Sequence, residues 1–547
     1  MHDLRSYLAS LENSMPDHIR RVKEPVSHEY AITAMVEEAA KTHENPALLF
    51  ENVEGFKQPV LVNVFGHVDR VKLALEGASR PMATRVDLYG EWSELMAKEI
   101  EPEFVGYGST KQVKFFGGDV DLMSLPVLKF YEQDAGRYLT SGLLVARDPD
   151  MPEKVNLSFA RMQLKGRARI GTSLHSRGNM WSYFEKSKAR GEPLDVAVVI
   201  GAHPSIYLAA AAKITGEYET AGAMAGEPVQ LVKCETVDIP VPADAEIVLE
   251  GRITLSEEDE GPFTEYTGYL SGRSTRNRLE ISCVTMRNDA IYQTIMPSNS
   301  DEHLLLSGLP KQARIYGAVR AFTPMPAVRD IAWPVSGTHY LCLISMLGDA
   351  RRVPGLGKHL GLLIMGLDPY VKMAVVLPED VDVSDLGAAL SAIAQRCDGR
   401  FGSGVEVLHE VFCHRLDPSS SPEGTSSKVL IDATAQPRMV ELDPDLAERP
   451  TSLGIAEAGH PMGTVGVTVL KMRASWDPKS ALRALEVPGL TVCVDDDIDV
   501  LDVRQVVWGM MTRFQPGEDL ILSDGHIGID GTKPEGWKAE KATLPRS

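Results

Sequence analysis

The sequence predicts a mixed α/β protein of several domains, and three observations support this fold class. The chain has 547 residues, enough for several domains of about 150 residues each. Its centre contains one strand-like segment after another. Its last third contains an acidic motif that occurs twice, at residues 379–383 and at residues 496–500. Together they predict an α/β entry domain, a central antiparallel barrel or sandwich decorated by helices, and a duplicated α/β unit.

The N-terminal segment, residues 1–115, is predicted to be an α/β domain. Leu4, Leu8 and Leu11 have the spacing of one helix face. Residues 46–66 then contain two β-rich runs separated by a turn with glycine. We therefore expect a helix followed by two strands.

The central segment, residues 116–325, has the strongest strand signal. Strand-like runs bounded by turns lie at residues 155–174, 194–201, 230–242, 246–255 and 279–296. The run at 155–174 is split into two by a charged turn, and the run at 194–201 precedes a helix-like, alanine-rich stretch. Many short strands with few helices between them favour antiparallel pairing.

The C-terminal segment, residues 326–547, is predicted to contain the duplicated unit. Each acidic motif precedes a helix, and the two helices end near Arg396 and Arg513, an offset of 117 residues that the motifs share. LIDAT at 430–434 is echoed by GIDGT at 528–532 with a shorter spacing, so the second copy is trimmed. Residues 416–427 are rich in Ser, Pro and Gly and are expected to form a surface loop.

Charge and composition exclude several classes of function. Fifty-six Lys and Arg residues against 76 Asp and Glu give a net charge of -20, which disfavours nucleic acids and anionic membranes as partners. The six cysteines show no CxxC spacing and are expected to be reduced thiols. No secretory signal or membrane span is recognisable, so we expect a cytoplasmic protein. Dinucleotide-binding, P-loop, zinc-protease and serine-hydrolase motifs are missing.

Two polar clusters in strand-rich surroundings are candidates for chemistry. In the first, strand alternation puts Asn156 and Ser158 on one face, with Arg161 on the other unless a bulge intervenes. On these residues alone, a solvated edge strand is the favoured interpretation. In the second, Glu260 and Glu265 flank a Gly-Pro turn that can fold both carboxylates toward one pocket, as a general acid requires. An acidic hairpin tip is an equally good interpretation.

A third candidate set combines residues that are distant in sequence. His175 follows an apolar strand, and Glu217 begins the segment EYETAGAMAGE. With Asn156 they would offer imidazole nitrogen and amide or carboxylate oxygen to a divalent ion such as Mn²⁺. Each residue taken singly is more typical of a structural role.

An ordered series of segments resembles the UbiD family of prenylated-flavin-dependent decarboxylases. The series comprises LRSYLASLEN, PALLFENVEGFKQPVLVNVFG, NLSFARMQLKG, LDVAVVIGAHPSIYLAAA, VKCETVDIPVPADAEIVLEG and EGPFTEYTGY. The resemblance runs nearly end to end. It implies a split-barrel flavin-binding domain at residues 116–325 and a C-terminal oligomerisation domain at residues 326–547. The implied activity is that of a carboxy-lyase, with reversible loss of CO₂ from an aromatic, heteroaromatic or α,β-unsaturated acid.

The resemblance also implies roles for individual residues. Arg161 matches the arginine of the family's Glu-Arg-Glu network, and Glu260 and Glu265 match its two acids. Arg161 would orient the substrate carboxylate, Glu260 would hold Arg161, and Glu265 would deliver a proton to carbon. Thr264 stands where many relatives have glycine.

The implied cofactors are prenylated FMN, Mn²⁺ and K⁺. The metal that bridges to the flavin phosphate would be held by residues matching Asn156, His175 and Glu217, and Ser158 and Arg161 would also lie at the cofactor.

Relatives use a lysine before the acidic motif to contact the same phosphate. The first copy has Lys372 there, whereas the second has Gly489 at the matching place. Lys372 is therefore the candidate, and Lys471 is a weaker one.

Other implications concern partners and alternatives. A flavin prenyltransferase would supply the cofactor, and the protein would form a homo-oligomer, either a dimer or a hexamer. Polar residues at Ser298, Asn299 and His303 suggest a substrate with a ring heteroatom or hydroxyl. The alternatives are a physiological carboxylase of an aromatic compound and a non-catalytic flavin-binding subunit of a carboxylase assembly. Retention of Arg161 with both acids argues against the second.

Overall fold

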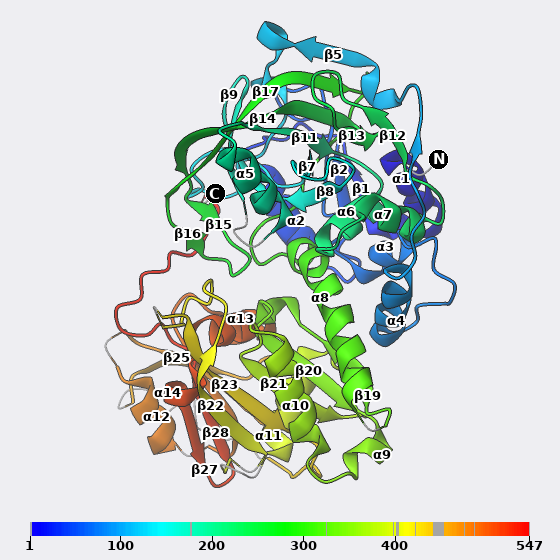
Figure 1. The fold of residues 1–547 in the computed structure, drawn as a ribbon. Coiled ribbons are helices and arrows are strands. Elements are labelled where there is room, and N and C mark those ends of the chain that lie inside the picture. Colours follow the sequence, from blue (N-terminus) through cyan, green and yellow to red (C-terminus); the bar gives the residue numbers. More distant parts are fainter. Residues whose placement is uncertain are drawn as a thin grey trace. The chain divides into compact units, whose positions relative to one another are not determined.

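The structure is a computed structural model, and it consists of two compact units. It describes residues 3–174, 178–323, 325–397, 399–400, 404–421, 423–440, 453–474, 476–485 and 487–545. Unit 1 comprises Met1–Pro81, Glu91–Lys311 and Glu540–Ser547, and unit 2 comprises Met82–Gly90 and Gln312–Ala539. The chain enters unit 2 after Pro81, returns to unit 1 within helix α4 (Arg85–Leu95), and enters unit 2 again within helix α8 (Asp301–Phe322). Its last residues return to unit 1 (Figure 1).

Unit 1 is a mixture of helices and antiparallel sheet, as the sequence predicts. Its helices are α1 (Leu4–Ser14), α2 (Ala31–Ala39), α3 (Val68–Leu73), α5 (Asn179–Ala189), α6 (Pro204–Ala211) and α7 (Glu217–Ala225). Its largest sheet contains β5 (Val113–Phe116), β6 (Tyr138–Leu139), β7 (Leu143–Arg147), β8 (Val155–Phe159), β9 (Arg161–Gly166), β10 (Arg169–Ser173), β11 (Leu194–Ile200), β14 (Ile247–Glu260) and β17 (Ser274–Met286). The strand order is β6-β9-β10-β17-β14-β11-β7-β8, with β5 on β17.

This sheet bends back on itself at a single residue. Strand β8 pairs with β7 at one end of the sheet, whereas β9 pairs with β6 and β10 at the other end. Only Ala160 separates β8 from β9. Two strands that are neighbours in the chain lie at opposite ends of the strand order, so the sheet curls toward closure. The predicted split barrel is thereby confirmed, and the single strand expected through residues 156–161 is in fact two strands.

A second sheet of unit 1 joins the beginning of the chain to the end of the central segment. Its strands are β1 (Ile19–Val22), β2 (Ala47–Phe50), β3 (Val60–Val62) and β18 (Tyr292–Gln293), in that order. The predicted helix through Leu4, Leu8 and Leu11 is α1, and the two predicted strands after it are β2 and β3. One hydrophobic core extends from Val22 to Met296 and includes both sheets. The boundaries expected at 115/116 and 325/326 stay predictions.

The smaller strands of unit 1 lie around these sheets. They are β4 (Glu103–Phe104), β12 (Gln230–Lys233), β13 (Pro240–Pro242), β15 (Phe263–Thr264) and β16 (Leu270–Ser271). Strands β15 and β16 form a short antiparallel pair directly after β14.

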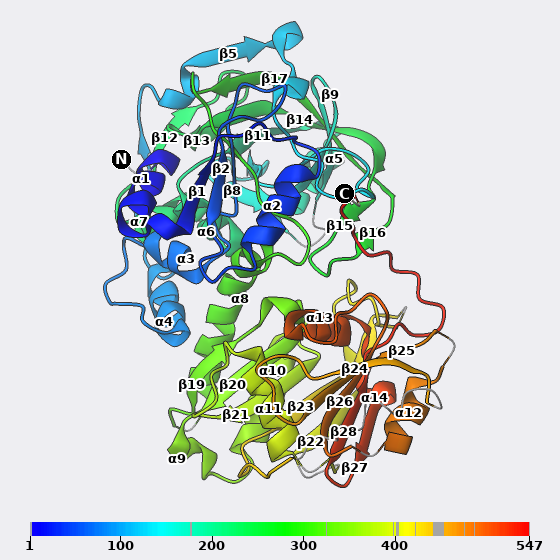
Figure 2. The same ribbon diagram turned by 180° about the vertical axis from the view of Figure 1, so that it is seen from behind.

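Unit 2 contains two five-stranded sheets of the same topology (Figure 2). The first has the order β19-β20-β21-β23-β22 and the second β24-β25-β26-β28-β27. The first copy comprises β19 (Val328–Ala332), β20 (Leu341–Met346), α9 (Gly348–Arg351), α10 (Leu356–Leu367), β21 (Met373–Pro378), α11 (Leu386–Arg396), β22 (Val405–Phe412) and β23 (Thr425–Asp432). The second comprises β24 (Ile455–Gly459), β25 (Val467–Met472), α12 (Pro478–Leu485), β26 (Gly489–Val494), α13 (Val503–Arg513), α14 (Pro516–Asp519), β27 (Leu520–Ser523) and β28 (His526–Asp530).

Local structure confirms the predicted duplication. Helices α11 and α13 end at Arg396 and Arg513, as expected, and each is N-capped by an aspartate side chain. The LIDAT and GIDGT motifs make the same turn, in which the Thr434 or Thr532 backbone N–H and hydroxyl bond to the aspartate two residues earlier. The two copies therefore share sequence, topology and turn chemistry.

Two further expectations concern membrane-spanning helices and the segment 416–427. No helix in the described part of the chain is long and apolar enough to cross a membrane. The segment 416–427 is not simply a surface loop, because Asp417 is buried and β23 begins at Thr425.

Candidate active site

Arg161, Glu260 and Glu265 come together in unit 1, as the family resemblance implies. The Arg161 guanidinium donates from Nη2 to Oε2 of Glu260 at 2.5 Å and from Nη1 to Oε1 of Glu265 at 2.6 Å. Its Nη1 also donates to the hydroxyl of Ser271 at 2.9 Å. The two glutamates lie about a hundred residues from Arg161 in the sequence, so only the fold brings these three charges together.

The side chains of this ion-pair cluster are largely buried. The Glu260 side chain is fully buried, and those of Arg161 and Glu265 are 15% and 21% exposed. Burial alone would lower the pKa of Arg161, but the carboxylates of Glu265 and Glu260 outweigh it and raise that pKa. The guanidinium is therefore a fixed positive charge. Glu265 is the member of the cluster most open to solvent.

Local backbone structure sets the positions of the two acids. Glu260 is the last residue of β14, and Gly261 follows with a φ of +84°. A Cβ atom at Gly261 would meet the carbonyl oxygen of Gly272 at 3.0 Å, so glycine is required both for space and for backbone conformation. The chain then forms the β15–β16 hairpin, with Glu265 directly after β15. The predicted Gly-Pro turn thus directs both carboxylates to one guanidinium.

A second polar cluster joins β8 to the first turn of α7. Asn156 is buried on β8, and its side-chain amide donates to Oε1 of the buried Glu217. The Ser158 hydroxyl donates to Oδ1 of Asn156 at 2.8 Å. These two β8 residues share a face, as alternation predicts, but the solvated edge expected there is wrong because Asn156 is covered.

The Glu217 carboxyl has the properties of a cation ligand. Its Oε2 atom is buried and has no hydrogen-bond partner among the described residues. Burial raises its pKa from an ordinary 4.5 to about 8. A bound cation would satisfy that oxygen and favour the carboxylate. The oxygens of Glu217 and Asn156 suit a hard divalent ion such as Mn²⁺.

The third predicted ligand, His175, lies outside the described residues, just after β10. Among the described residues, no three His, Cys, Asp or Glu side chains gather to hold a metal. The predicted set includes an asparagine and His175, so its completeness stays a prediction.

Lys372 is engaged inside unit 2 rather than left open to a ligand. Its side chain is 1% exposed, and its ammonium lies 2.9 Å from Asp417 and 2.8 Å from the Ser419 hydroxyl. It also donates to the carbonyl oxygens of Met511 and Phe514. An ammonium has three N–H donors, and these contacts occupy them. The predicted contact of Lys372 with the flavin phosphate stays a prediction. The weaker candidate, Lys471, pairs with Glu457 at 2.7 Å.

Among the residues predicted to face the substrate, His303 contacts the ring of Tyr266, the residue after Glu265. The His303 ring meets the ring of Tyr266 edge to face, with centroids 6.5 Å apart. The Nδ1 atom of His303 lies 3.2 Å from the carbonyl oxygen of Ser298, and burial lowers the pKa of His303. The Oδ1 atom of Asn299 is buried without a partner among the described residues. Contact of these residues with a substrate stays a prediction.

Ser271 and Asp134 were not predicted from the sequence. Ser271 bonds to Arg161, and Asp134 bonds to the residue before Glu265. Neither lies in a motif, and their partners are distant in sequence, so no local pattern could identify them.

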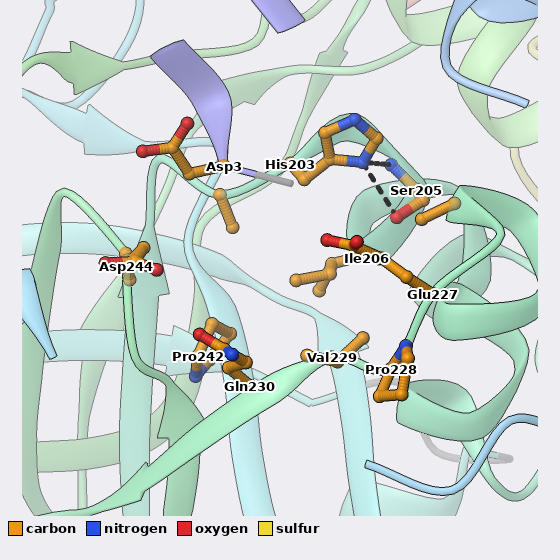
Figure 3. Close-up of a pocket in the computed structure, with 13 residues that line it drawn as sticks. Asp3, His203, Ser205, Ile206, Glu227, Pro228, Val229, Gln230, Pro242 and Asp244 are labelled. Atoms are coloured by element: carbon orange, nitrogen blue, oxygen red, sulfur yellow. Dashed lines mark hydrogen bonds between the residues drawn. The ribbon is translucent and has the colours of Figure 1, made fainter. Parts of the chain in front are cut away.

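A pocket elsewhere in unit 1 does not include these residues. It lies at the start of α6, where Nδ1 of His203 contacts Ser205, and Asp3, Glu227 and Asp244 also line it (Figure 3). None of the predicted site residues lines this pocket.

Three family profiles match most of the chain. They are the N-terminal, Rift-related and C-terminal domains of 3-octaprenyl-4-hydroxybenzoate carboxy-lyase, UbiD. The N-terminal profile matches residues 14–91, the Rift-related profile residues 106–300, and the C-terminal profile residues 304–433 and 456–542.

Individual relatives agree with these profiles. Anhydromevalonate phosphate decarboxylase of Methanothermobacter thermautotrophicus is 35% identical over 322 residues, covering 58% of this chain and 74% of the relative. The UbiD-class enzyme HmfF from Pelotomaculum thermopropionicum, solved with FMN, has 32% identity and a TM-score of 0.73, covering 82% of this chain and 98% of its own. An evolved dimeric form of HmfF, solved with prFMN, is 30% identical to this chain with a TM-score of 0.70. The match covers 83% of this chain and 99% of the HmfF chain. Vanillic acid decarboxylase of Sedimentibacter hydroxybenzoicus, in its open form, has 29% identity and a TM-score of 0.70. The match covers 85% of this chain and 96% of the decarboxylase chain.

Proposed function

The chain belongs to the UbiD family of carboxy-lyases, and from this premise we propose that it decarboxylates an unsaturated carboxylic acid with prenylated FMN. The substrate class is aromatic, heteroaromatic or α,β-unsaturated, and the reaction is reversible and non-oxidative. The observation that carries this proposal is the guanidinium of Arg161 held between the carboxylates of Glu260 and Glu265. Relatives whose names describe decarboxylases, and a relative solved with prFMN, support it.

Arg161 is proposed to bind and orient the substrate carboxylate. Its buried Nε–H has no hydrogen-bond partner among the described residues, so the guanidinium retains a donor for an incoming anion. Charge-assisted hydrogen bonds to a carboxylate are short and directional. Glu260, fully buried and bonded to Nη2, keeps the guanidinium plane in one orientation.

Glu265 is proposed to hold the proton that replaces CO₂. When Glu265 is protonated, Arg161 and Glu260 remain as a neutral ion pair. The bond between the substrate carbon and its carboxylate breaks, CO₂ leaves, and the Glu265 proton forms the new C–H bond. Glu265 is then a carboxylate again. Its partial exposure allows solvent to return the proton.

The cofactor assignments rest on the second cluster. Prenylated FMN, when bound, supplies an electron-accepting centre for the carbon that loses CO₂. Asn156 and Glu217, with His175, are proposed to hold Mn²⁺ near its phosphate, aided by K⁺ and by Ser158. The unpartnered Oε2 of Glu217 supports a cation at this position.

The proposal extends to partners and to location. The cofactor would come from a flavin prenyltransferase, the protein would act in the cytoplasm, and it would assemble with copies of itself. The dimeric form of HmfF supports self-association. Contact of Lys372 with the flavin phosphate stays a prediction, and it would require exchange of the bonds that its ammonium makes within unit 2.

A substrate panel tests this function. The protein is co-expressed with a flavin prenyltransferase, its modified-flavin absorbance and manganese content are measured, and CO₂ release is followed from aryl, heteroaryl and acrylic acids. We expect release from one chemical class. Purified protein that holds no flavin under these conditions would contradict the cofactor assignment.

A further inference from the structure

The loop that carries Glu265 is enclosed by two other segments of unit 1. The loop comprises residues 261–271, and within it the Glu265 N–H donates to the carbonyl oxygen of Tyr269 at 2.9 Å. The Gly268 N–H donates back to the carbonyl oxygen of Glu265 at 2.9 Å. These local bonds fix the shape of the turn. Its position against Arg161 depends on the segments around it.

The first of these segments is residues 131–138. The Oδ1 atom of Asp134 accepts two hydrogen bonds from Thr264, one from its N–H and one from its hydroxyl, each at 3.0 Å. Its Oδ2 atom accepts from the N–H of Tyr131 at 3.0 Å. Asp134 is 3% exposed, so water competes little for these bonds. Because Thr264 immediately precedes Glu265, Asp134 anchors the backbone from which the Glu265 side chain extends.

The second segment is the C-terminal residues 540–545. The Leu270 N–H donates to the carbonyl oxygen of Glu540 at 2.9 Å, and the Ala542 N–H donates to that of Gly268 at 3.0 Å. The segment thus pairs antiparallel with the far side of the loop. Figures 1 and 2 both show the C-terminal end of the chain beside β15 and β16.

The two enclosing segments are also bonded to each other. The Glu132 N–H donates to the carbonyl oxygen of Thr543 at 3.1 Å. The Gln133 side-chain amide donates to the Thr543 hydroxyl at 2.6 Å and accepts from the Thr543 N–H at 3.0 Å. The loop, residues 131–138 and residues 540–545 therefore form a closed ring of hydrogen bonds.

We propose that Asp134 and the C-terminal segment 540–545 are positioning elements that hold Glu265 against Arg161 for proton delivery. The inference rests on the proposed function, because that function gives Glu265 its proton. The ring acts on Glu265 through the loop backbone. A misplacement of about 1 Å can cost a catalytic group about 100-fold in rate, so loosening the ring lowers kcat. Cofactor binding, which is assigned to the cluster of Asn156 and Glu217, is unaffected.

Two matched pairs of variants test the ring in the holoenzyme. Thr264→Val removes the hydroxyl that donates to Asp134, whereas Thr264→Ser keeps it. Ala542→Pro removes the N–H that donates to Gly268, whereas Ala542→Gly keeps it. A fifth variant, Gln133→Ala, weakens the ring at a point that does not adjoin the loop, because it removes both side-chain hydrogen bonds to Thr543. For each, kcat, KM, bound flavin and hydrogen–deuterium exchange of residues 261–271 are measured.

We expect kcat to fall about 10- to 100-fold in Thr264→Val, Ala542→Pro and Gln133→Ala, with bound flavin unchanged and faster exchange in residues 261–271. The serine and glycine variants should behave as wild type. Faster hydrogen–deuterium exchange without a change in kcat would overturn the positioning role. Unchanged exchange in Thr264→Val, Ala542→Pro and Gln133→Ala would overturn it too. If Glu265→Gln turned over normally, the proton role would fail, whereas the exchange data would still report on the ring.

Discussion

Lys372, in the first copy of the duplicated unit, donates a hydrogen bond of 2.9 Å to the carbonyl oxygen of Met511 in the second copy. Met511 lies in the last turn of α13, where unpaired carbonyl oxygens form the negative end of the helix dipole. The same ammonium is paired with the buried Asp417. Lys372 therefore links the two copies and caps a helix.

This arrangement predicts that Lys372→Met destabilises the protein. The change would leave the Asp417 carboxylate buried without its partner, which typically costs about 3–5 kcal/mol of unfolding free energy. Denaturant unfolding of the cofactor-free protein measures it. Lys471→Met, which removes only a partly exposed pair with Glu457, is the control and should change stability little. If Lys372→Met kept its stability but lost its flavin, the result would support the phosphate role of Lys372 instead.

The sequence predicted those features of the fold that depend on local pattern. Helix α1, strands β2 and β3 and the ends of α11 and α13 follow from apolar spacing and from repeated motifs. The turn at Gly261 was predicted for the same reason, because a Gly-Pro pair determines local backbone shape.

Features that depend on distant partners could not be predicted in this way. Nothing near Lys372 in the sequence indicates that Asp417 and the end of α13 surround it. The break at Ala160 cannot be predicted from local pattern, because strand propensity continues through it, whereas the pairing partners change. The convergence of Arg161 with Glu260 and Glu265 was expected from the family resemblance, not from spacing.

Arg161→Lys should lower kcat/KM by about 100-fold or more. A lysine ammonium cannot contact Glu260 and Glu265 through two planar nitrogens and also present a donor to the substrate. Steady-state kinetics of CO₂ release measure the loss. Arg252→Lys, at a surface pair with Asp195, is the matched control. Kinetics equal to those of the control would contradict the carboxylate-binding role.

Glu217→Ala should reduce both bound manganese and bound flavin. The variant loses the carboxylate whose Oε2 atom lacks a partner, so the phosphate would lose its cation. Elemental analysis and flavin absorbance are the measurements. Glu219→Ala, two residues along the same helix, controls for the loss of a negative charge. Full manganese occupancy in Glu217→Ala would rule out Glu217 as a ligand.

The raised pKa of Glu217 predicts how the stability of metal-free protein depends on pH. Between pH 4.5 and about 8 the folded state holds a proton that the unfolded state has released. Folding stability therefore falls as pH rises through this window. Glu217→Gln, which cannot ionise, should lack this component, and added Mn²⁺ should reduce it in the wild type. Identical pH profiles for wild type and Glu217→Gln would contradict burial of an uncompensated carboxyl.

The central claim is that Glu265 delivers a proton to the carbon that loses CO₂. The most direct test compares wild type with Glu265→Gln at equal flavin content, in D₂O, with a substrate found in the panel. Glutamine can still accept the bond from Arg161, but it cannot supply a proton at neutral pH. We predict that wild type releases CO₂ and forms a product with one deuterium at that carbon, whereas Glu265→Gln keeps its flavin and forms no product. Turnover of Glu265→Gln at a rate close to that of wild type would contradict the claim.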